Sequence, residues 1–390
     1  MMLDRGSEIS SFLEERATDL NNGTANLNVG WALTKLGESG WFGYAIPESL
    51  GGRGGSLLQA VEAISSVSQC CLTTGFVFWC QRVFIQYLAA SNNTYLQNKI
   101  LPAVLKGEIA GATGLSNAMK YLGGIEELRL QAKIEGENVT VNGFLPWASN
   151  LDSNGEFIVA VAAQTTSGQT LILALPSFAE GLKRGEDLQL LGLQASRTST
   201  LEFDRVQLSH DWIISFEAEK FLPSVRPCFL LLQCGLALGI TRKSLGETEK
   251  SLGGKAAVAS DRYFFARERL TRLEKTIEQF STLESFDLGR TRQLFTLRVD
   301  ITRLAVESVW LEAEIKGGKG YFRNSDTARR LREVAFLPVL TPSLIQLERE
   351  LQRQSSTVDI LAAVKRTAIP HHATFLGWSL NGVDASPKNA

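Results

Sequence analysis

The sequence is poor in the residues that build metal centres and disulfide frameworks. Its 390 residues include only three histidines and five cysteines. The cysteines are odd in number, show no C-x-x-C spacing and lie in apolar stretches such as Phe78-Trp79-Cys80, which is typical of reduced core thiols. His371 and His372 are adjacent, and neighbouring side chains diverge on most backbones. We therefore expect neither disulfides nor a metal site.

The chain also lacks an excess of charge, a leader-like start and a long apolar run. Forty basic and 41 acidic residues leave a net charge of −1. The chain therefore has no overall positive charge that would attract nucleic acid or an anionic membrane. The first residues contain no basic region followed by an apolar stretch. The apolar run 229–240 is too short to span a bilayer. We expect a cytoplasmic protein without nucleic-acid or membrane partners.

What the chain does have is enough apolar sequence for a large core, with 44% hydrophobic and 21% charged residues. Its hydrophobic period changes from helical to alternating near residue 109 and back to helical near residue 216. The predicted fold class is α+β, and its parts follow in chain order. They are an N-terminal helical domain (1–108), a middle β-barrel or sandwich (109–215), a C-terminal four-helix bundle (216–354) and an irregular tail (355–390).

Specific stretches of the sequence support the two changes of hydrophobic period. Apolar and polar residues alternate over 128–134 and 139–141, and short strands separated by turns that contain glycine are predicted over 157–163, 170–175 and 201–208. After residue 216, apolar residues recur at spacings of three and four in four stretches, over about 229–245, 270–280, 294–315 and 340–351. Each such helix has one face to bury, and four of them form a bundle most economically.

Short motifs of glycine, proline, tryptophan and small hydroxyl residues are spread along the chain. In order they are Ile46-Pro47-Glu48, Leu101-Pro102, Gly114-Leu115-Ser116-Asn117, Trp147-Ala148-Ser149-Asn150, the segment 191–206 and Gly317-Gly318-Lys319-Gly320-Tyr321. In order, spacing and context they resemble the motifs of the acyl-CoA dehydrogenase superfamily of flavoproteins, over roughly residues 10–353. This resemblance implies the same helix, strand, helix fold and a FAD cofactor, with FMN as the alternative.

The resemblance also implies roles for single residues. Ser116 matches the hydroxyl residue that touches the flavin ring, Trp147 lies against the ring, and Ser149 bonds near its N5 edge. A flavin N5 needs a hydroxyl donor and a large aromatic that excludes water, so these residue types suit the task. Taken singly, Ser116 is more often a turn serine and Trp147 a core tryptophan. Together, at the family's spacing, the two residues favour the flavin role.

The glycine turn near the C-terminal end of the bundle has a different implied role. Gly317, Gly318 and Gly320 match the turn that meets the flavin pyrophosphate, where glycine lets backbone amides approach phosphate oxygens. In the family this turn serves the flavin of a neighbouring subunit. We therefore expect a homodimer or homotetramer.

Departures from the family pattern concern catalysis. Counting from Gly317-Gly318, the position of the family's catalytic glutamate holds Thr341, and the alternative position, counted back from Gly239, holds Phe229. A threonine hydroxyl cannot act as a general base at neutral pH. The segments 119–122 and 246–254 also depart from the family's acyl-CoA contacts and flavin clamp.

Three functions remain open at this point. The first is a flavin-dependent oxidoreductase that acts on an acyl thioester or similar small molecule, with a base from another position such as Glu217 or Glu219 and an electron-transfer flavoprotein as acceptor. The second is a monooxygenase that takes reduced flavin from a reductase and needs no such base. The third is a non-catalytic scaffold that retains the fold.

Overall fold

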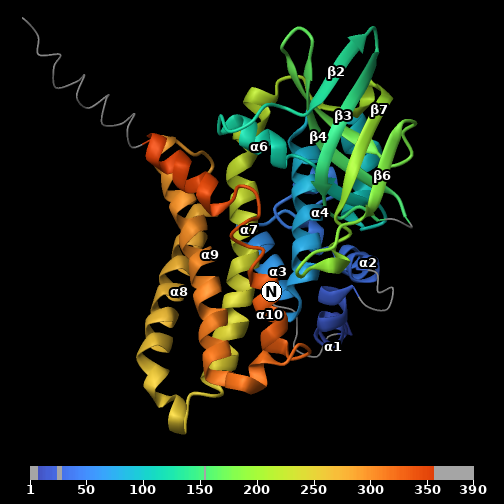
Figure 1. The fold of residues 1–390 in the computed structure, drawn as a ribbon. Helices are drawn as coiled ribbons and strands as arrows, with labels where there is room; N and C mark the ends of the chain where they lie inside the picture. Colours follow the sequence, from blue (N-terminus) through green and yellow to red (C-terminus); the bar gives the residue numbers. More distant parts are fainter. Residues whose placement is uncertain (1–7, 24–28, 153–154, 355–390) are drawn as a thin grey trace, which may run out of the picture.

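The computed structural model describes residues 8–23, 29–152 and 155–354. Helices from both ends of the chain lie together, and a β-sheet region lies at one end of them (Figure 1). The predicted order of helices, strands and helices is confirmed. The tail predicted over 355–390, with His371 and His372, lies outside the described residues. The domain boundaries themselves remain predictions.

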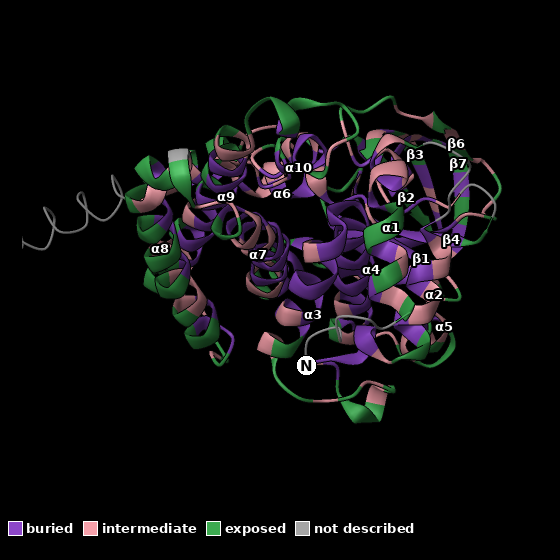
Figure 2. Cartoon of the chain, turned by 90° about the horizontal axis from the view of Figure 1, so that it is seen from below, coloured by how far each residue is buried: buried purple, intermediate pink, exposed green. Residues whose placement is uncertain are grey.

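The N-terminal part consists of helices packed around α4. The elements are α1 (Glu8–Asn22), α2 (Gly30–Glu38), α3 (Leu57–Cys70), α4 (Leu72–Ala90) and α5 (Leu101–Leu105). Helix α3 begins with a capping box between Ser56 and Gln59. Helix α4 is buried on nearly every side, which explains why its sequence is apolar all round rather than on one face (Figure 2).

The middle part is one mixed sheet. Its described strands are β1 (Ala110–Thr113), β2 (Leu130–Glu135), β3 (Asn138–Ala148), β4 (Phe157–Thr165), β5 (Thr170–Pro176), β6 (Leu182–Asp187), β7 (Ser199–Ser209) and β8 (Ile213–Ser215). They are ordered β6-β7-β3-β2-β4-β5-β8, and β1 pairs in parallel with β4. The three predicted short strands correspond to β4, β5 and β7, and the two alternating stretches fall on β2 and β3. A helix that was not predicted, α6 (Ser116–Leu122), follows β1.

Both faces of the sheet are covered at β4. Ile158 and Ala160 join the core shared with the helices, while Val159 and Val161 join a second core within the β part. Successive side chains of a strand point to opposite faces, so this division follows from the strand geometry. A strand covered on both faces is expected to be continuously apolar, as the sequence of β4 is.

The C-terminal part is built on three long helices that lie side by side (Figure 1). They are α7 (Ala218–Glu249), α8 (Ser260–Phe280) and α9 (Leu288–Lys316), followed by the short α10 (Asp326–Val334) and a last described helix over 344–354. The fourth predicted helix, over about 340–351, thus begins only at residue 344. By length and composition α7 alone among the described helices is a candidate membrane span, but 72% of its apolar window is buried inside the protein.

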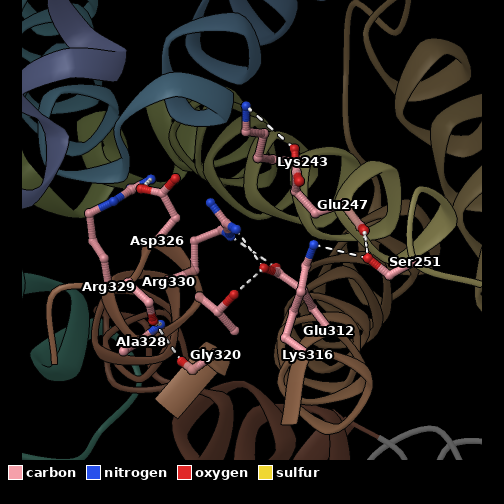
Figure 3. Close-up of polar contacts among 12 residues, drawn as sticks. Lys243, Glu247, Ser251, Glu312, Lys316, Gly320, Asp326, Ala328, Arg329 and Arg330 are labelled. Carbon is pink, nitrogen blue, oxygen red and sulfur yellow. Dashed lines mark hydrogen bonds and ion pairs between the residues drawn. The ribbon is translucent and has the colours of Figure 1, made fainter. Parts of the chain in front are cut away.

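A buried ion pair fixes α10 against α9. The Glu312 carboxylate accepts hydrogen bonds from Arg330 Nε at 2.9 Å and from Thr327 Oγ1 at 2.7 Å. The side chains of Glu312 and Arg330 are 0% and 4% exposed, and the pair lies between the two helices (Figure 3). On α10 itself, Arg329 pairs with Glu333 at 2.8 Å. These contacts determine where the chain leaves α10.

The buried pair gives a stability prediction. Glu312→Gln removes the negative charge and leaves Arg330 buried beside a neutral amide, so we expect unfolding to become easier by about 3 kcal/mol. The control is Glu314→Gln on the same helix, because Glu314 pairs with Arg262 at the surface and such pairs contribute less than about 1 kcal/mol. The measurement is the urea midpoint of both variants. Equal midpoints would contradict the structural role of Glu312.

Candidate functional site

A cavity of about 420 Å³ lies where the helices meet the sheet. Its walls come from α4, the end of β1 and start of α6, the end of β3, the segment 188–198, α7, and the stretch from α10 to residue 341. Segments from all three parts of the chain therefore contribute, and most of the lining is apolar. Clefts between packed layers with a few convergent polar groups are the usual form of small-molecule sites.

Most of the residues singled out from the sequence lie on this cavity. Ser116, Trp147, Ser149 and Thr341 all line it, and so does Phe229. Ser116 is the first residue of α6. These residues come from separate parts of the sequence, and the fold brings them together.

The glycine turn is not part of this cavity. Gly317, Gly318 and Gly320 form a short 3₁₀ turn after α9 and are absent from the cavity lining. Gly317 has a φ of 57°, and a Cβ added to Gly320 would lie 2.8 Å from Lys316 Cβ, so both glycines serve the turn itself. Their role at a neighbouring subunit's flavin stays a prediction.

Hydroxyl groups form a chain along one wall. Ser149 Oγ lies 2.7 Å from Thr198 Oγ1, which lies 2.8 Å from Ser196 Oγ. Thr113, at the end of β1, also lines the cavity. Sequence reasoning did not assign Thr113, Ser196 or Thr198. The serine and threonine two residues apart in the segment 191–206 were the available signal for the last two.

The tryptophan motif at the end of β3 is held from behind by a buried amide pair. Asn150 has a φ of 64°, and its Nδ2 donates to Gln81 Oε1 at 3.0 Å and to the Gly111 carbonyl at 2.9 Å. Its backbone N–H donates to the Ser196 carbonyl at 2.9 Å. Asparagine tolerates this left-handed conformation better than most residues. These bonds turn the chain so that Trp147 and Ser149 reach the cavity.

Aromatic side chains make up much of the apolar wall. Trp79 packs edge-on against Phe229 with ring centroids 5.0 Å apart, and Phe76 packs in the same way against Phe336 at 4.7 Å. Trp147 is 49% exposed, although it is a large aromatic. Its ring is therefore not fully packed into the core and can contact a ligand.

Thr341 lies on a turn whose backbone is held by two buried polar side chains. Gln233 Nε2 donates to the Thr341 carbonyl at 2.8 Å, and Arg298 Nε donates to Gln233 Oε1 at 2.9 Å. Arg298 also donates to the Leu337 carbonyl at 3.3 Å. Both polar side chains are fully buried, and burial lowers the pKa of the Arg298 guanidinium to about 10.

The described lining of the cavity carries a single charged side chain. Of the described residues that line it, none is aspartate or glutamate, and Arg332 is the only charged one. Glu217 and Glu219, at the start of α7, are absent from the lining. Within residues 8–23, 29–152 and 155–354, no cluster of three metal-ligating side chains occurs. In this part of the chain, no carboxylate of the lining can serve as a base.

Comparisons with known proteins agree with the motifs. Residues 8–108 match the family model described as the acyl-CoA dehydrogenase N-terminal domain. A short-chain-specific acyl-CoA dehydrogenase of Clostridium acetobutylicum is 24% identical over 77% of this chain and 82% of its own. The solved glutaryl-coenzyme A dehydrogenase complex with glutaryl-CoA aligns with a TM-score of 0.78 at 17% identity, over 94% of this chain and 96% of that one. A nitroalkane oxidase crystallized with 1-nitrohexane also reaches 0.78, at 16% identity over 89% and 94%.

The amide pair behind the tryptophan motif gives the second prediction. Asn150→Asp turns the Nδ2 donor into an acceptor that faces two other acceptors, so we expect a loss of at least about 1–3 kcal/mol of stability. The matched control is Asn142→Asp, because Asn142 accepts from the Arg205 N–H and aspartate still accepts. Thermal unfolding followed by circular dichroism compares the two variants. A control that loses as much stability as Asn150→Asp would refute this reading of the amide pair.

Proposed function

Because the chain is a member of the acyl-CoA dehydrogenase superfamily, we propose that it is a FAD-dependent oxidoreductase acting on a small organic substrate in the cavity. The observation that carries the proposal is that Ser116, Trp147 and Ser149, from two separate motifs, line the same cavity. Bound FAD would supply a two-electron acceptor there. An electron-transfer flavoprotein or a flavin reductase would be the redox partner.

The residues of the cavity fit a flavin ring. Such a ring is flat and apolar on its faces and carries polar atoms along its edges. A half-exposed tryptophan can cover a face, and the hydroxyls of Ser116, Ser149 and Thr113 can bond to an edge. In this assignment Trp147 excludes water from one side of the ring, and the serine hydroxyls orient it.

The chemistry of thioester dehydrogenation fits less well. In that reaction a carboxylate removes the α-proton of the acyl group, and the two positions where the family places it hold Thr341 and Phe229. The described lining offers no other carboxylate. This observation favours a second candidate, oxygenation with reduced flavin supplied by a partner reductase. The same fold occurs in a glutaryl-CoA dehydrogenase and in a nitroalkane oxidase.

The first test concerns the flavin assignment. We expect Trp147→Ala to weaken FAD binding by about 2-fold to 10-fold, because a ring contact is worth about 0.5–1.5 kcal/mol. Trp310→Ala is the control, since Trp310 is similarly exposed at 55% but lies on α9, outside the cavity lining. Titration of the apoprotein with FAD, followed by absorbance, gives both affinities.

Two results would count against this assignment. An unchanged FAD affinity in a folded Trp147→Ala variant would remove Trp147 from the site. Absence of binding of either FAD or FMN to the wild type, oxidised or reduced, would favour the non-catalytic scaffold over both enzymatic functions.

The second test concerns the base position. We expect flavin reduction by saturated acyl-CoAs to be slow in the wild type and faster in Thr341→Glu, because general-base catalysis contributes about 10²-fold to 10⁴-fold. Thr341→Gln is the control, since glutamine has the size of glutamate without its basicity. Anaerobic stopped-flow absorbance measures the rate for several chain lengths. Rapid reduction in the wild type would show that another group of the protein acts as the base.

A further inference from the structure

The cavity combines an apolar lining with positive charge and lacks a compensating acid. Its mouth includes Leu191 and Val339, which are 72% and 65% exposed although both are apolar. Inside lie the aromatic rings of α4 and α7, and at the edge lies Arg332. No described lining residue carries a negative charge. An occupant that matches these walls has an apolar body and a negatively charged group.

Arg332 retains hydrogen-bonding capacity for such a group. Its NH1 donates to the Arg323 carbonyl at 3.1 Å and its NH2 to Asn22 Oδ1 at 3.2 Å, while its buried Nε has no partner among the described residues. A guanidinium has five N–H donors, and these bonds use two of them. Arg332 is half-buried, so a bond to a ligand there is less weakened by water than at the surface.

Arg332 has one carboxylate and two other cations as neighbours. Burial has the largest effect and lowers the pKa of the guanidinium, Glu333 raises it, and Arg323 and Arg329 lower it by smaller amounts. Glu333 itself is bound to Arg329 at 2.8 Å. A ligand anion would therefore relieve repulsion among cations as well as form new hydrogen bonds.

A second cation lies behind Thr341. Arg298 is fully buried, and its recorded partners are Gln233, Thr302 and the Leu337 carbonyl, all of them neutral. Through Gln233 it is linked to the carbonyl of Thr341, which lines the cavity. In a low-dielectric interior an unbalanced charge acts over a longer range than in water. The positive potential of the cavity thus has two independent sources.

We propose that the cavity is a binding site for an organic anion, in which Arg332 holds a carboxylate and the aromatic wall holds an apolar chain or ring. This names the substrate class of the proposed oxidoreductase and rests on that function only in calling the ligand a substrate. The bidentate geometry of a guanidinium favours carboxylate over a neutral amide of the same shape.

The test compares two probes of equal size, octanoate and octanamide. Isothermal titration calorimetry on the purified full chain measures the affinity of each at pH 7.5 and low salt. We expect octanoate to bind about 10-fold to 100-fold more tightly than octanamide, since charge-assisted hydrogen bonds are strong. In Arg332→Gln most of this preference should be lost, and only the part due to the buried Arg298 should remain. Equal binding of both probes by the wild type, or an unchanged ratio in Arg332→Gln, would overturn the proposal.

Two further variants separate charge from local structure. Asn22→Ala removes the hydrogen bond to Arg332 but keeps the guanidinium, so it should retain most of the preference for octanoate. Arg332→Lys keeps the positive charge without the bidentate geometry, so it should retain part of the preference. Loss of the preference in Asn22→Ala as large as in Arg332→Gln would mean that the packing of α1 against α10, and not the charge, is responsible. That result would refute the proposal even when Arg332→Gln folds poorly.

Inorganic phosphate distinguishes a carboxylate site from a phosphate site. We expect it to compete weakly with octanoate, because it has no apolar body. Competition as strong as that of octanoate itself would refute the proposal. The absorbance of the same sample with FAD tests the proposed function separately. A protein that binds FAD without preferring octanoate fails only this inference, and one that prefers octanoate without binding FAD fails only the proposed function.

Discussion

The buried contact between Gln81 and Asn150 is the constraint on which the site depends. Gln81 lies in the middle of α4, is fully buried, and uses both ends of its amide. It donates to the carbonyls of Val104 and Ile109 and accepts from Asn150 and from the Gly111 N–H. An unsatisfied amide there would cost several kilocalories per mole, so the amide holds its partners in one arrangement. It thereby sets the distance between the helical wall of the cavity and the end of β3.

Much of the fold could be predicted because hydrophobic period is a local property. The alternation in β2, the short apolar runs of β4 and β5 and the stripes of α8 and α9 are visible in any short window of sequence. The strand β6 is not, because Leu182–Asp187 pairs at the sheet edge with mainly polar residues. The late start of the last helix has a simple cause: Pro338 and Pro342 lie in the stretch after α10, and proline does not fit a helix interior.

Only the site residues that lie in a sequence motif, or at a counted distance from one, could be predicted. Trp147 and Ser149 belong to one continuous motif, so a single sequence was sufficient to propose them. Arg332 follows the glycine turn in the family pattern, but the resemblance implied no contact with a substrate for it. It reaches the cavity because α10 is fixed to α9 by the buried pair of Glu312 and Arg330. A contact that depends on such long-range packing leaves no local pattern. The absence of carboxylates was foreseen at two positions, whereas the single positive charge on the described lining required the structure.

That sign has consequences for chemistry that do not depend on which substrate binds. A buried guanidinium without an acid, such as Arg298, is costly, and the chain holds it through the neutral acceptors Gln233 and the Leu337 carbonyl. Its field and that of Arg332 favour any negative charge that is present or develops in the cavity, a ligand carboxylate or an electron-rich reduced cofactor alike. The same field makes it unfavourable for a basic group in the cavity to take up a proton and become positively charged. A cavity of this kind binds and stabilises anions well, but it has no carboxylate in its described lining with which to take a proton from carbon.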